Sequence, residues 1–550
     1  MVRIENKKII LTGSLIKKRS YSTGRQHYFR LKRKEKLKIT IEIEESENKI
    51  EKATLEFEKH INGERFESDL KPTPGNKFEG IISFDFYGVC RFKAKYLKNG
   101  NWYRDNVVYS YMIIDPEYID KISIYTMIPG ASGKISDWIK AIPEIRDMGF
   151  NTIHILPVTE TGSSGSPYAA AKLFQMDPLY YEEKHDGFRE FDKFIKALIK
   201  NKIRLCVDLV LNHVALESKI RNNYPDWLAE DPDEADGIKR AGWSEGEKWH
   251  KWSDLAFINY TPFTPDSREA LWEYMTGYAL FWARYAAMTG GMIRLDNLHS
   301  SYKPFLQYLL REVREKYPSL IIIGEIFTHE KRLIRLTLEY GINLLLATPW
   351  EHKFVPEIRK YLKHLHSYKE SLRFFFPICS HDSGSPAEEF GDVKSTIPRM
   401  ILSALAGPGP SGIVQGVEYG IKKRIDFINQ KTKLEISSNY DFTELFEELN
   451  KIVRNNNEFQ IPGNIEFVDN NHEAVIGIIR KSPKTGLPSF IVLINFDIKN
   501  PQELYLNTEK LNIIKNKQLL NLFNGETILP GPGKTLFSLP PCGFLVYRIK

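Results

Sequence analysis

The stretch GGMIRLDNLH, residues 290–299, begins as a short apolar run and ends in polar side chains. Residues i and i+2 of a strand point to the same face, so Arg294 and Asp296 are expected side by side where a strand ends. Taken alone, such a pair is equally well explained as a buried ion pair that finishes a strand. The surrounding sequence decides between this structural interpretation and a functional one.

This stretch is one unit of a longer alternation. The helix-length amphipathic segment KPFLQYLLREVREKYP follows it, and then a second apolar run, LIIIGEI. Similar runs, each followed by a helix-length segment, begin at Ile122, Asn151, Ile203, Met292, Leu320, Ile342, Leu372 and Ser411. Runs that are apolar on both faces and alternate with helices indicate a parallel sheet. Eight such units predict the α/β class and a closed (β/α)₈ TIM barrel.

The flanking regions have a different pattern. Residues 1–118 contain short runs with alternating polarity, such as KLKITIEIE and FEGIISFDF, and residues 456–550 return to it with NIEFVD and SFIVLINF. This pattern predicts an antiparallel β-sandwich on each side of the barrel. The barrel itself is assigned to residues 119–455. Its insertion after the third strand, at about 213–264, is too long for an ordinary loop and predicts a small subdomain.

Composition narrows the function classes. The chain has 550 residues, of which 42% are apolar and 27% charged, as in ordinary globular proteins. Its net charge of +7 is not gathered in one block, so no nucleic-acid partner is expected. No run approaches the ~20 apolar residues of a membrane span, so no membrane partner is expected either. The four cysteines are scattered, which favours a reducing cytoplasm. Oligomeric state stays open.

Polar side chains follow four of the predicted barrel strands. They are Asp208, Asn212 and His213 after the third strand, Arg294 and Asp296 after the fourth, Glu325 after the fifth, and His381 and Asp382 after the seventh. Barrel active sites lie at the carboxyl ends of the strands, so these groups are expected at one rim. Convergence from four strands favours the functional interpretation.

Three carboxylates and an arginine suit the cleavage of a glycosidic bond. Retaining cleavage needs a carboxylate nucleophile and a carboxylic acid about 5–5.5 Å apart, here Asp296 and Glu325. A positive neighbour lowers a carboxylate pKa, so Arg294 is expected to keep Asp296 ionised. Imidazoles such as His213 and His381 are donors suited to sugar hydroxyls.

Four motifs, DLVLNH, GMIRLD, GEIF and SHD, follow one another in order, together with SPYAAAKLFQMDP and LPPCGFLVYRI. In this set the chain resembles the α-amylase family, family thirteen of the glycoside hydrolases, over about residues 119–550. The longer motifs RLDNLHSS, with His299 three residues after Asp296, GEIFTHE and SHDSGSP more closely resemble the glucanotransferase half of eukaryotic-type glycogen debranching enzyme.

The resemblance implies a role for each matching residue. Asp296 is the nucleophile, Glu325 the acid/base and Asp382 the transition-state stabiliser. Further substrate-binding positions are Arg294, His213, His381, Tyr168 and His299, supported by Asp208 and Asn212. The residue corresponding to Asn212 ligates calcium in many amylases, but other ligands are not evident. No metal site and no other cofactor is therefore predicted, with calcium left open.

Four tryptophans are candidates for stacking on glucose rings. Trp243, Trp249 and Trp252 lie in the polar insertion, where burial in a core is a poorer explanation than usual, and Trp350 follows the sixth strand. Trp272 and Trp282 lie on a long amphipathic segment and are expected in the core.

Together these features predict an α-retaining enzyme acting on α-1,4-glucans (maltooligosaccharides, starch or glycogen) through a covalent glycosyl-enzyme intermediate. The longer motifs favour 4-α-glucanotransferase activity. An amylase-like hydrolase of the same fold is the alternative, since both reactions share the intermediate. A non-catalytic glucan-binding protein is disfavoured, because all three carboxylates are present.

Overall fold

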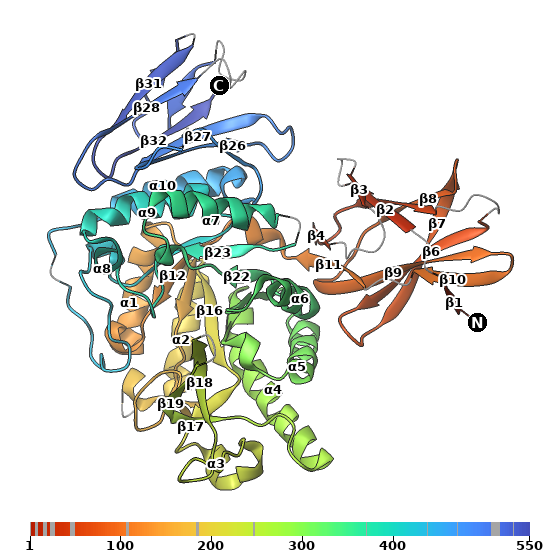
Figure 1. Ribbon diagram of the computed structural model, residues 1–550. Coiled ribbons are helices and arrows are strands. Elements are labelled where there is room, and N and C mark those ends of the chain that lie inside the picture. The colour runs from red at the N-terminus through yellow and green to blue at the C-terminus, as the bar shows by residue number, and fades with distance from the viewer. Residues whose placement is uncertain are drawn as a thin grey trace.

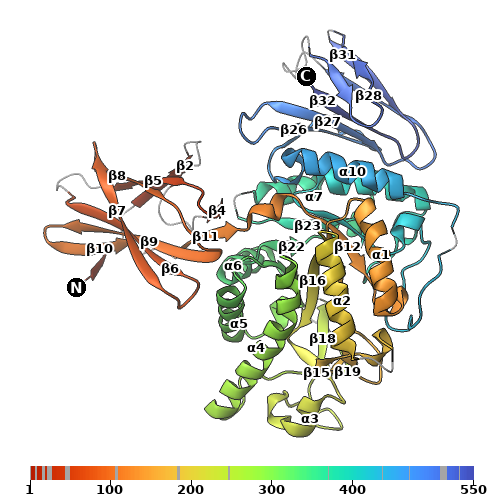
Figure 2. The ribbon, with the colours of Figure 1, turned by 180° about the vertical axis from the view of Figure 1, so that it is seen from behind.

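The computed structural model describes residues 2–5, 9–14, 19–21, 28–43, 50–105, 109–182, 186–245, 248–369, 371–436, 438–469, 471–507, 517–531 and 533–550. A central barrel lies between an N-terminal β-domain at its side and a C-terminal β-domain that covers one flank (Figures 1 and 2).

Eight parallel strands close the barrel and confirm the predicted fold class. They are β12 (Ser123–Met127), β13 (Thr152–Ile155), β16 (Arg204–Val210), β20 (Met292–Asp296), β21 (Ile321–Gly324), β22 (Leu344–Leu346), β23 (Phe374–Pro377) and β24 (Ser411–Val414). Most of their residues are buried, because side chains fill the barrel on one face and helices cover the other. This explains the near-continuous apolar runs in the sequence.

Helices surround these strands (Figure 1). They are α1 (Ile135–Asp147), α2 (Gly187–Lys200), α4 (Pro265–Met288), α5 (Lys303–Lys316), α6 (Glu330–Tyr340), α7 (Val355–Ser367), α8 (Pro386–Phe390), α9 (Thr396–Ile401) and α10 (Thr443–Asn455). The start of α4 shows the local cause: Thr264 accepts a hydrogen bond from the Ser267 amide, and Pro265 fits the first turn.

The N-terminal β-domain is one eleven-stranded sheet around its own core. Its strands are β1 (Val2–Glu5), β2 (Ile9–Ser14), β3 (Arg19–Tyr21), β4 (Tyr28–Lys32), β5 (Leu37–Ile43), β6 (Lys52–Lys59), β7 (Arg65–Thr73), β8 (Lys77–Ile82), β9 (Gly88–Lys98), β10 (Asn101–Asp105) and β11 (Ser110–Asp115). Most pairs are antiparallel, but β1 with β10 and β4 with β11 are parallel. Long intervening chain allows such pairs, which short hairpins cannot form.

A buried polar network joins this domain to the barrel. Arg30 on β4 binds both carboxylate oxygens of Asp115, at 2.9 and 2.6 Å. Arg30 also donates to the carbonyl of Asn343, whose side-chain amide donates to Asp115. Because Asn343 immediately precedes β22, the contact lies at the amino-terminal end of the barrel strands, away from the predicted rim.

The C-terminal domain packs against α7 and α10 (Figures 1 and 2). Its strands are β25 (Ile465–Phe467), β26 (Val475–Lys481), β27 (Pro488–Asn495), β28 (Gln502–Asn507), β29 (Leu519–Asn521), β30 (Thr527–Ile528), β31 (Lys534–Leu539) and β32 (Phe544–Ile549). A six-stranded sheet and the β28–β31 pair enclose a shared core. His366 on α7 links this domain to the barrel. Its Nδ1 accepts a hydrogen bond from the Gly463 amide, and its Nε2 donates one to the Ala406 carbonyl, each at 2.8 Å.

Two smaller additions stand beside the carboxyl ends of the strands. The hairpin of β14 (Thr159–Thr161) and β15 (Ala170–Met176) follows β13. The insertion forms a sheet of β17 (His213–Ala215), β19 (Lys248–Phe257) and β18 (Arg240–Glu245), together with the short helix α3 (Lys219–Asn223). Within the described ranges, no helix is both long and apolar enough to cross a membrane. All four cysteines are buried and free.

Candidate active site

Strand register brings the predicted carboxylates to one end of the barrel. Asp208 on β16 pairs with Arg294 on β20, and Val210 pairs with Asp296. On the other side of β20, Leu295 pairs with Gly324, the residue before Glu325. Because neighbouring strands run parallel, these side chains emerge from adjacent positions at the carboxyl end.

The guanidinium of Arg294 contacts three carboxylates at once. Its Nη1 lies 2.6 Å from Oδ2 of Asp208 and 3.1 Å from Oδ1 of Asp296. Its Nη2 lies 2.7 Å from Oε1 of Glu325 in an ion pair. Asp296 and Glu325 side chains are only 13% and 11% exposed, so these charges interact with little screening by water.

A turn after β20 holds the second oxygen of Glu325. Asn297 adopts a left-handed conformation, with φ of 42°. In this turn its backbone amide donates a 3.0 Å hydrogen bond to Oε2 of Glu325. Asparagine tolerates this conformation better than most residues, which accounts for its place here. Both oxygens of Glu325 are therefore engaged.

Opposing influences act on the pKa of Asp296. Burial raises the pKa of Asp296 well above its usual range, and the negative charge of Glu325 raises it further. Arg294 lowers this pKa, as expected from the sequence, but burial and Glu325 outweigh its effect and the net shift is upward. One positive charge is divided among three carboxylates, and burial outweighs Arg294's share.

Tyr168 and His381 cover the inner side of the site. Their rings stack at 5.5 Å with 7° between planes, and the tyrosine hydroxyl lies 2.6 Å from Nε2 of His381. That hydroxyl also donates to Oδ2 of Asp208 at 3.0 Å. His381 Nε2 is 3.1 Å from Oδ2 of Asp382, whose side chain is 57% exposed. Burial lowers the pKa of His381 to about 3, which favours a neutral imidazole.

His213 and Asn212 lie just beyond β16. Burial lowers the pKa of His213 to about 4, and neither ring nitrogen has a hydrogen-bond partner among the described residues. The side-chain oxygen of Asn212 is also buried without a partner in that part of the chain. No group of three or more His, Cys, Asp or Glu side chains in the described ranges is arranged to hold a metal ion.

A cleft of about 970 Å³ opens above these groups. Of the predicted site residues it is lined by Tyr168, His213, Trp243, Trp249, Trp252, Asp296, His299, Glu325 and Asp382. Trp243 and Trp249 are 46% and 42% exposed, which is unusual for large apolar rings. Trp243 stacks on His250 at 4.5 Å, which holds its ring in place. Exposed flat rings beside carboxylates suit a sugar chain.

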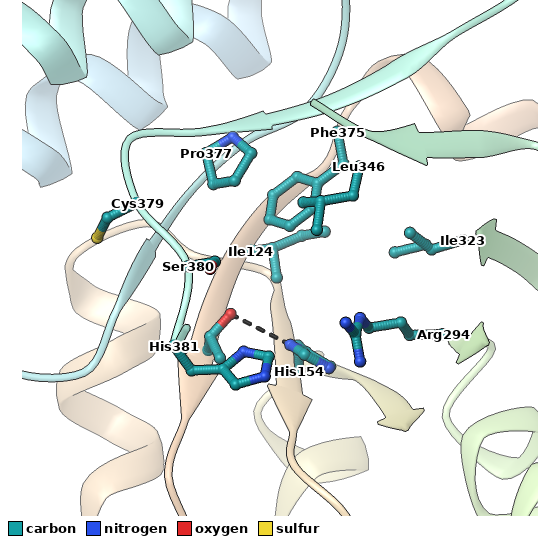
Figure 3. Close-up of a pocket in the computed structure, with 11 residues that line it drawn as sticks. Ile124, His154, Arg294, Ile323, Leu346, Phe375, Pro377, Cys379, Ser380 and His381 are labelled. Carbon is teal, nitrogen blue, oxygen red and sulfur yellow. Dashed lines mark hydrogen bonds between the residues drawn. The ribbon is translucent and has the colours of Figure 1, made fainter. Parts of the chain in front are cut away.

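Other predicted residues lie beneath or away from this cleft. Arg294 and His381 line a closed cavity of about 20 Å³ inside the barrel, with His154 facing both (Figure 3). Asp208 and Asn212 are buried below the cleft floor. Trp350, at the sixth strand, does not line the cleft.

Sequence reasoning missed several residues. Phe427 lies 6.0 Å from the Tyr168 ring and 5.5 Å from that of His381. It lies on the long loop after β24, where no motif marks it. Phe327 and Arg332 also line the cleft, and Arg332 donates to the His299 carbonyl at 3.1 Å. Phe327 is the last residue of GEIF and Arg332 comes five residues later, which was a usable signal, since residues following a barrel strand reach the rim.

Comparison with known proteins agrees with this arrangement. A family model described as glycogen debranching enzyme, glucanotransferase domain, matches residues 118–241. The α-1,4-glucan:maltose-1-phosphate maltosyltransferase of Picrophilus torridus is 24% identical over 432 residues, which are 72% of this chain and 64% of the relative. In these comparisons the chain is similar to members of the α-amylase superfamily.

A further relative and a solved structure show how far the likeness extends. A maltosyltransferase of the same name from Pseudomonas aeruginosa is 25% identical over 224 residues, covering 38% of this chain and 32% of that protein. The chain therefore spans less than two thirds of the length of these curated relatives. A maltogenic α-amylase of Thermotoga neapolitana shares the fold, with a TM-score of 0.62 and 19% identity over 78% of this chain and 99% of that one.

Proposed function

We propose that this protein is an α-retaining 4-α-glucanotransferase acting on α-1,4-glucans. The observation that carries the proposal is the shared contact of Arg294 with Asp296 and Glu325 on the floor of a cleft walled by exposed tryptophans. Carboxylates supply the chemistry of glycosyl transfer. Aromatic rings supply a surface for the glucan on either side of the broken bond.

In the first half-reaction, the carboxylate of Asp296 attacks the anomeric carbon of the donor glucan. Glu325 gives its proton to the glycosidic oxygen, so that bond breaks and the shortened glucan leaves with a hydroxyl. Asp382, exposed into the cleft, faces the positive charge that develops on the sugar ring. Tyr168 lies against the ring and the uncharged His213 binds its hydroxyls. His381, beneath the cleft, supports Tyr168 through the contact of its Nε2 with the tyrosine hydroxyl.

In the second half-reaction, Glu325 accepts a proton from the hydroxyl of an acceptor glucan. That oxygen attacks the anomeric carbon, and Asp296 leaves as a carboxylate. Water competes for the same intermediate at ~55 M, so transfer requires an acceptor held in an attack geometry. Trp243, Trp249 and Trp252 support this role, since they line one wall of the cleft that contains both carboxylates.

One specific observation favours a second candidate, maltosyl transfer from α-maltose 1-phosphate. Relatives named for that reaction align over as much as 72% of this chain. Arg332, which lines the cleft together with Glu325, provides a cation for a phosphate leaving group. The sugar chemistry at Asp296 would be the same, and only the leaving group would differ.

Incubation with pure maltopentaose tests the proposal. Chromatography should show both longer and shorter oligomers, with little net gain in reducing ends. Products that are only shorter, with reducing ends rising in step, would replace transfer by amylase-like hydrolysis. A parallel reaction with α-maltose 1-phosphate plus maltopentaose should release phosphate only if the second candidate holds. The Asp296→Asn variant is the matched control in both reactions.

A further inference from the structure

His154 is a buried histidine beside the proposed site that no motif marks. It lies on β13, is 5% exposed, and is not among the residues that line the cleft. Figure 3 shows its ring inside the barrel, facing the same closed cavity as Arg294 and His381. It therefore has no direct access to a glucan in the cleft.

Two hydrogen bonds fix the His154 ring. Its Nδ1 lies 3.2 Å from the hydroxyl of Thr126, the residue beside it in the β12–β13 register. Its Nε2 lies 3.2 Å from Oδ2 of Asp208. Burial alone would raise the pKa of Asp208, but Arg294 and His154 lower it to about 2, so this carboxylate only accepts. The Nε2 of His154 therefore carries the hydrogen and donates it.

The accepting oxygen is the one that holds Arg294. Oδ2 of Asp208 receives hydrogen bonds from His154, from Tyr168 at 3.0 Å and from Arg294 at 2.6 Å. Its other oxygen, Oδ1, is buried without a partner in the described part of the chain. A carboxylate held through one oxygen is free to turn if a donor is lost.

On one side Arg294 borders a small void instead of close-packed side chains. About 20 Å³ of open space lies there, walled mainly by apolar side chains such as Ile323, Leu346 and Phe375 (Figure 3). A guanidinium released by Asp208 has room to move toward this space and away from Asp296 and Glu325. The position of Arg294 thus depends on hydrogen bonds more than on close packing.

We propose that His154 is a positioning residue for glycosyl transfer, which orients Asp208 and, through Asp208, places Arg294 between Asp296 and Glu325. This inference rests on the proposed function for its kinetic consequences. It predicts that losing the His154 donor lowers kcat rather than substrate affinity, because the residue acts on the reacting carboxylates and not on the glucan. Misplacement by about 1 Å costs on the order of 10²-fold in rate.

Variants separate positioning from a merely structural role. His154→Phe removes both nitrogens and keeps a ring. His154→Gln keeps an amide N–H that reaches toward Asp208. Thr126→Val removes the hydroxyl that orients the imidazole at nearly constant volume. Ile323→Val is the matched control, since it disturbs the wall of the same cavity without touching the polar network.

The Phe variant should lose on the order of 10²-fold in kcat with little change in KM, and Gln should recover most of that loss. The acidic limb of the kcat/KM profile should move to higher pH in the Phe variant, because a displaced Arg294 no longer opposes the raised pKa of Asp296. Thr126→Val should move the acidic limb in the same direction, but by less than the Phe variant does. Ile323→Val should leave the limb in place.

Equal behaviour of His154→Phe and Ile323→Val, or no recovery with Gln, overturns the proposal. If the Phe variant fails to fold, an unshifted acidic limb in Thr126→Val overturns it. Crystal structures of the variants give a test without turnover: an Arg294–Asp208 contact that stays at 2.6 Å without the donor excludes positioning. Wild-type protein without activity on any glucan would instead overturn the proposed function.

Discussion

The backbone amide of Asn297 donates a 3.0 Å hydrogen bond to Oε2 of Glu325. This bond occupies Oε2 and leaves Oε1 as the oxygen that faces Arg294. That atom lies 2.7 Å from Nη2 of Arg294. Under the proposed function, in which Glu325 is the acid/base, Asn297 and Arg294 together fix the direction in which this carboxyl group points.

Replacing the proposed nucleophile should remove activity without removing the fold. Asp296→Asn deletes the attacking charge with almost no change in volume, so turnover of maltopentaose should fall by at least ~10³-fold. Asp254→Asn, which also changes a carboxylate lining the cleft, should retain most activity. Circular dichroism and thermal melting report the fold. Near wild-type turnover in Asp296→Asn would remove this residue from the mechanism.

The acid/base assignment of Glu325 has a separate test. In Glu325→Gln the loss with maltopentaose should exceed the loss with α-maltosyl fluoride by ~10-fold or more, since a fluoride leaving group needs no proton. In Asp296→Asn the turnover of both substrates should fall by the same factor. Equal losses in Glu325→Gln would argue against a proton-donating role.

Activity should have an acidic limit set by Asp296. Burial and Glu325 raise the pKa of this carboxyl group, and only its ionised form attacks. As pH falls through the raised pKa, kcat/KM should therefore fall in proportion to the protonated fraction. Arg294→Lys should move the limb upward, because a compact ammonium cannot reach three carboxylates together. An acidic limb at the ordinary aspartate pKa, near 4, would contradict this account.

The tryptophan wall should favour transfer over hydrolysis. Trp243→Ala or Trp249→Ala should lower the ratio of transfer to hydrolysis by about 5-fold each, equivalent to ~1 kcal/mol of lost aromatic contact. Trp272→Phe, on α4, keeps a large ring outside the cleft and is the matched control. Product ratios from maltopentaose are the measurement, and a ratio equal in all three variants would exclude an acceptor role.

Stability should weaken on mild acidification through His366. Burial lowers the pKa of His366 to about 3, while its unfolded value is near 6.5. Below pH 6.5 the unfolded chain therefore binds a proton at this residue that the folded protein does not bind. The contribution of neutral His366 to stability is complete above pH 6.5 and declines below it. At pH 5 the loss is ~2 kcal/mol. Melting curves of wild type and His366→Gln should show a smaller decrease between pH 7.5 and 5 in the variant.

Periodicity predicted the barrel well because each strand–helix unit is a local pattern. The run around Arg294 and Asp296 was recognisable as a strand ending at a rim, and the register of β16 and β20 agrees with that expectation. The two parallel pairs of the N-terminal sheet were not predictable in this way. Their partners are far apart in sequence, so no local pattern reports them.

Individual side chains were harder to predict where chemistry depends on distant neighbours. The pKa of Asp296 is raised by burial and by three other carboxylates, Glu325, Asp208 and Asp382, none of which is visible in the motif MIRLD. His154 is a polar residue within an apolar strand, and its partner Asp208 comes 54 positions later. Phe427 approaches Tyr168 from a loop that has no regular pattern.

The sheet of the insertion begins at His213 itself. His213 pairs with Phe257 across β17 and β19, while β18 and β19 carry Trp243, Trp249 and Trp252. A hydrogen-bonded ladder does not allow the aromatic wall to shift independently of the histidine. Under the proposed function, an acceptor that moves this wall changes how tightly the donor glucose is held at His213. By thermodynamic linkage the donor changes the affinity of the acceptor by the same factor, so the two glucans bind cooperatively.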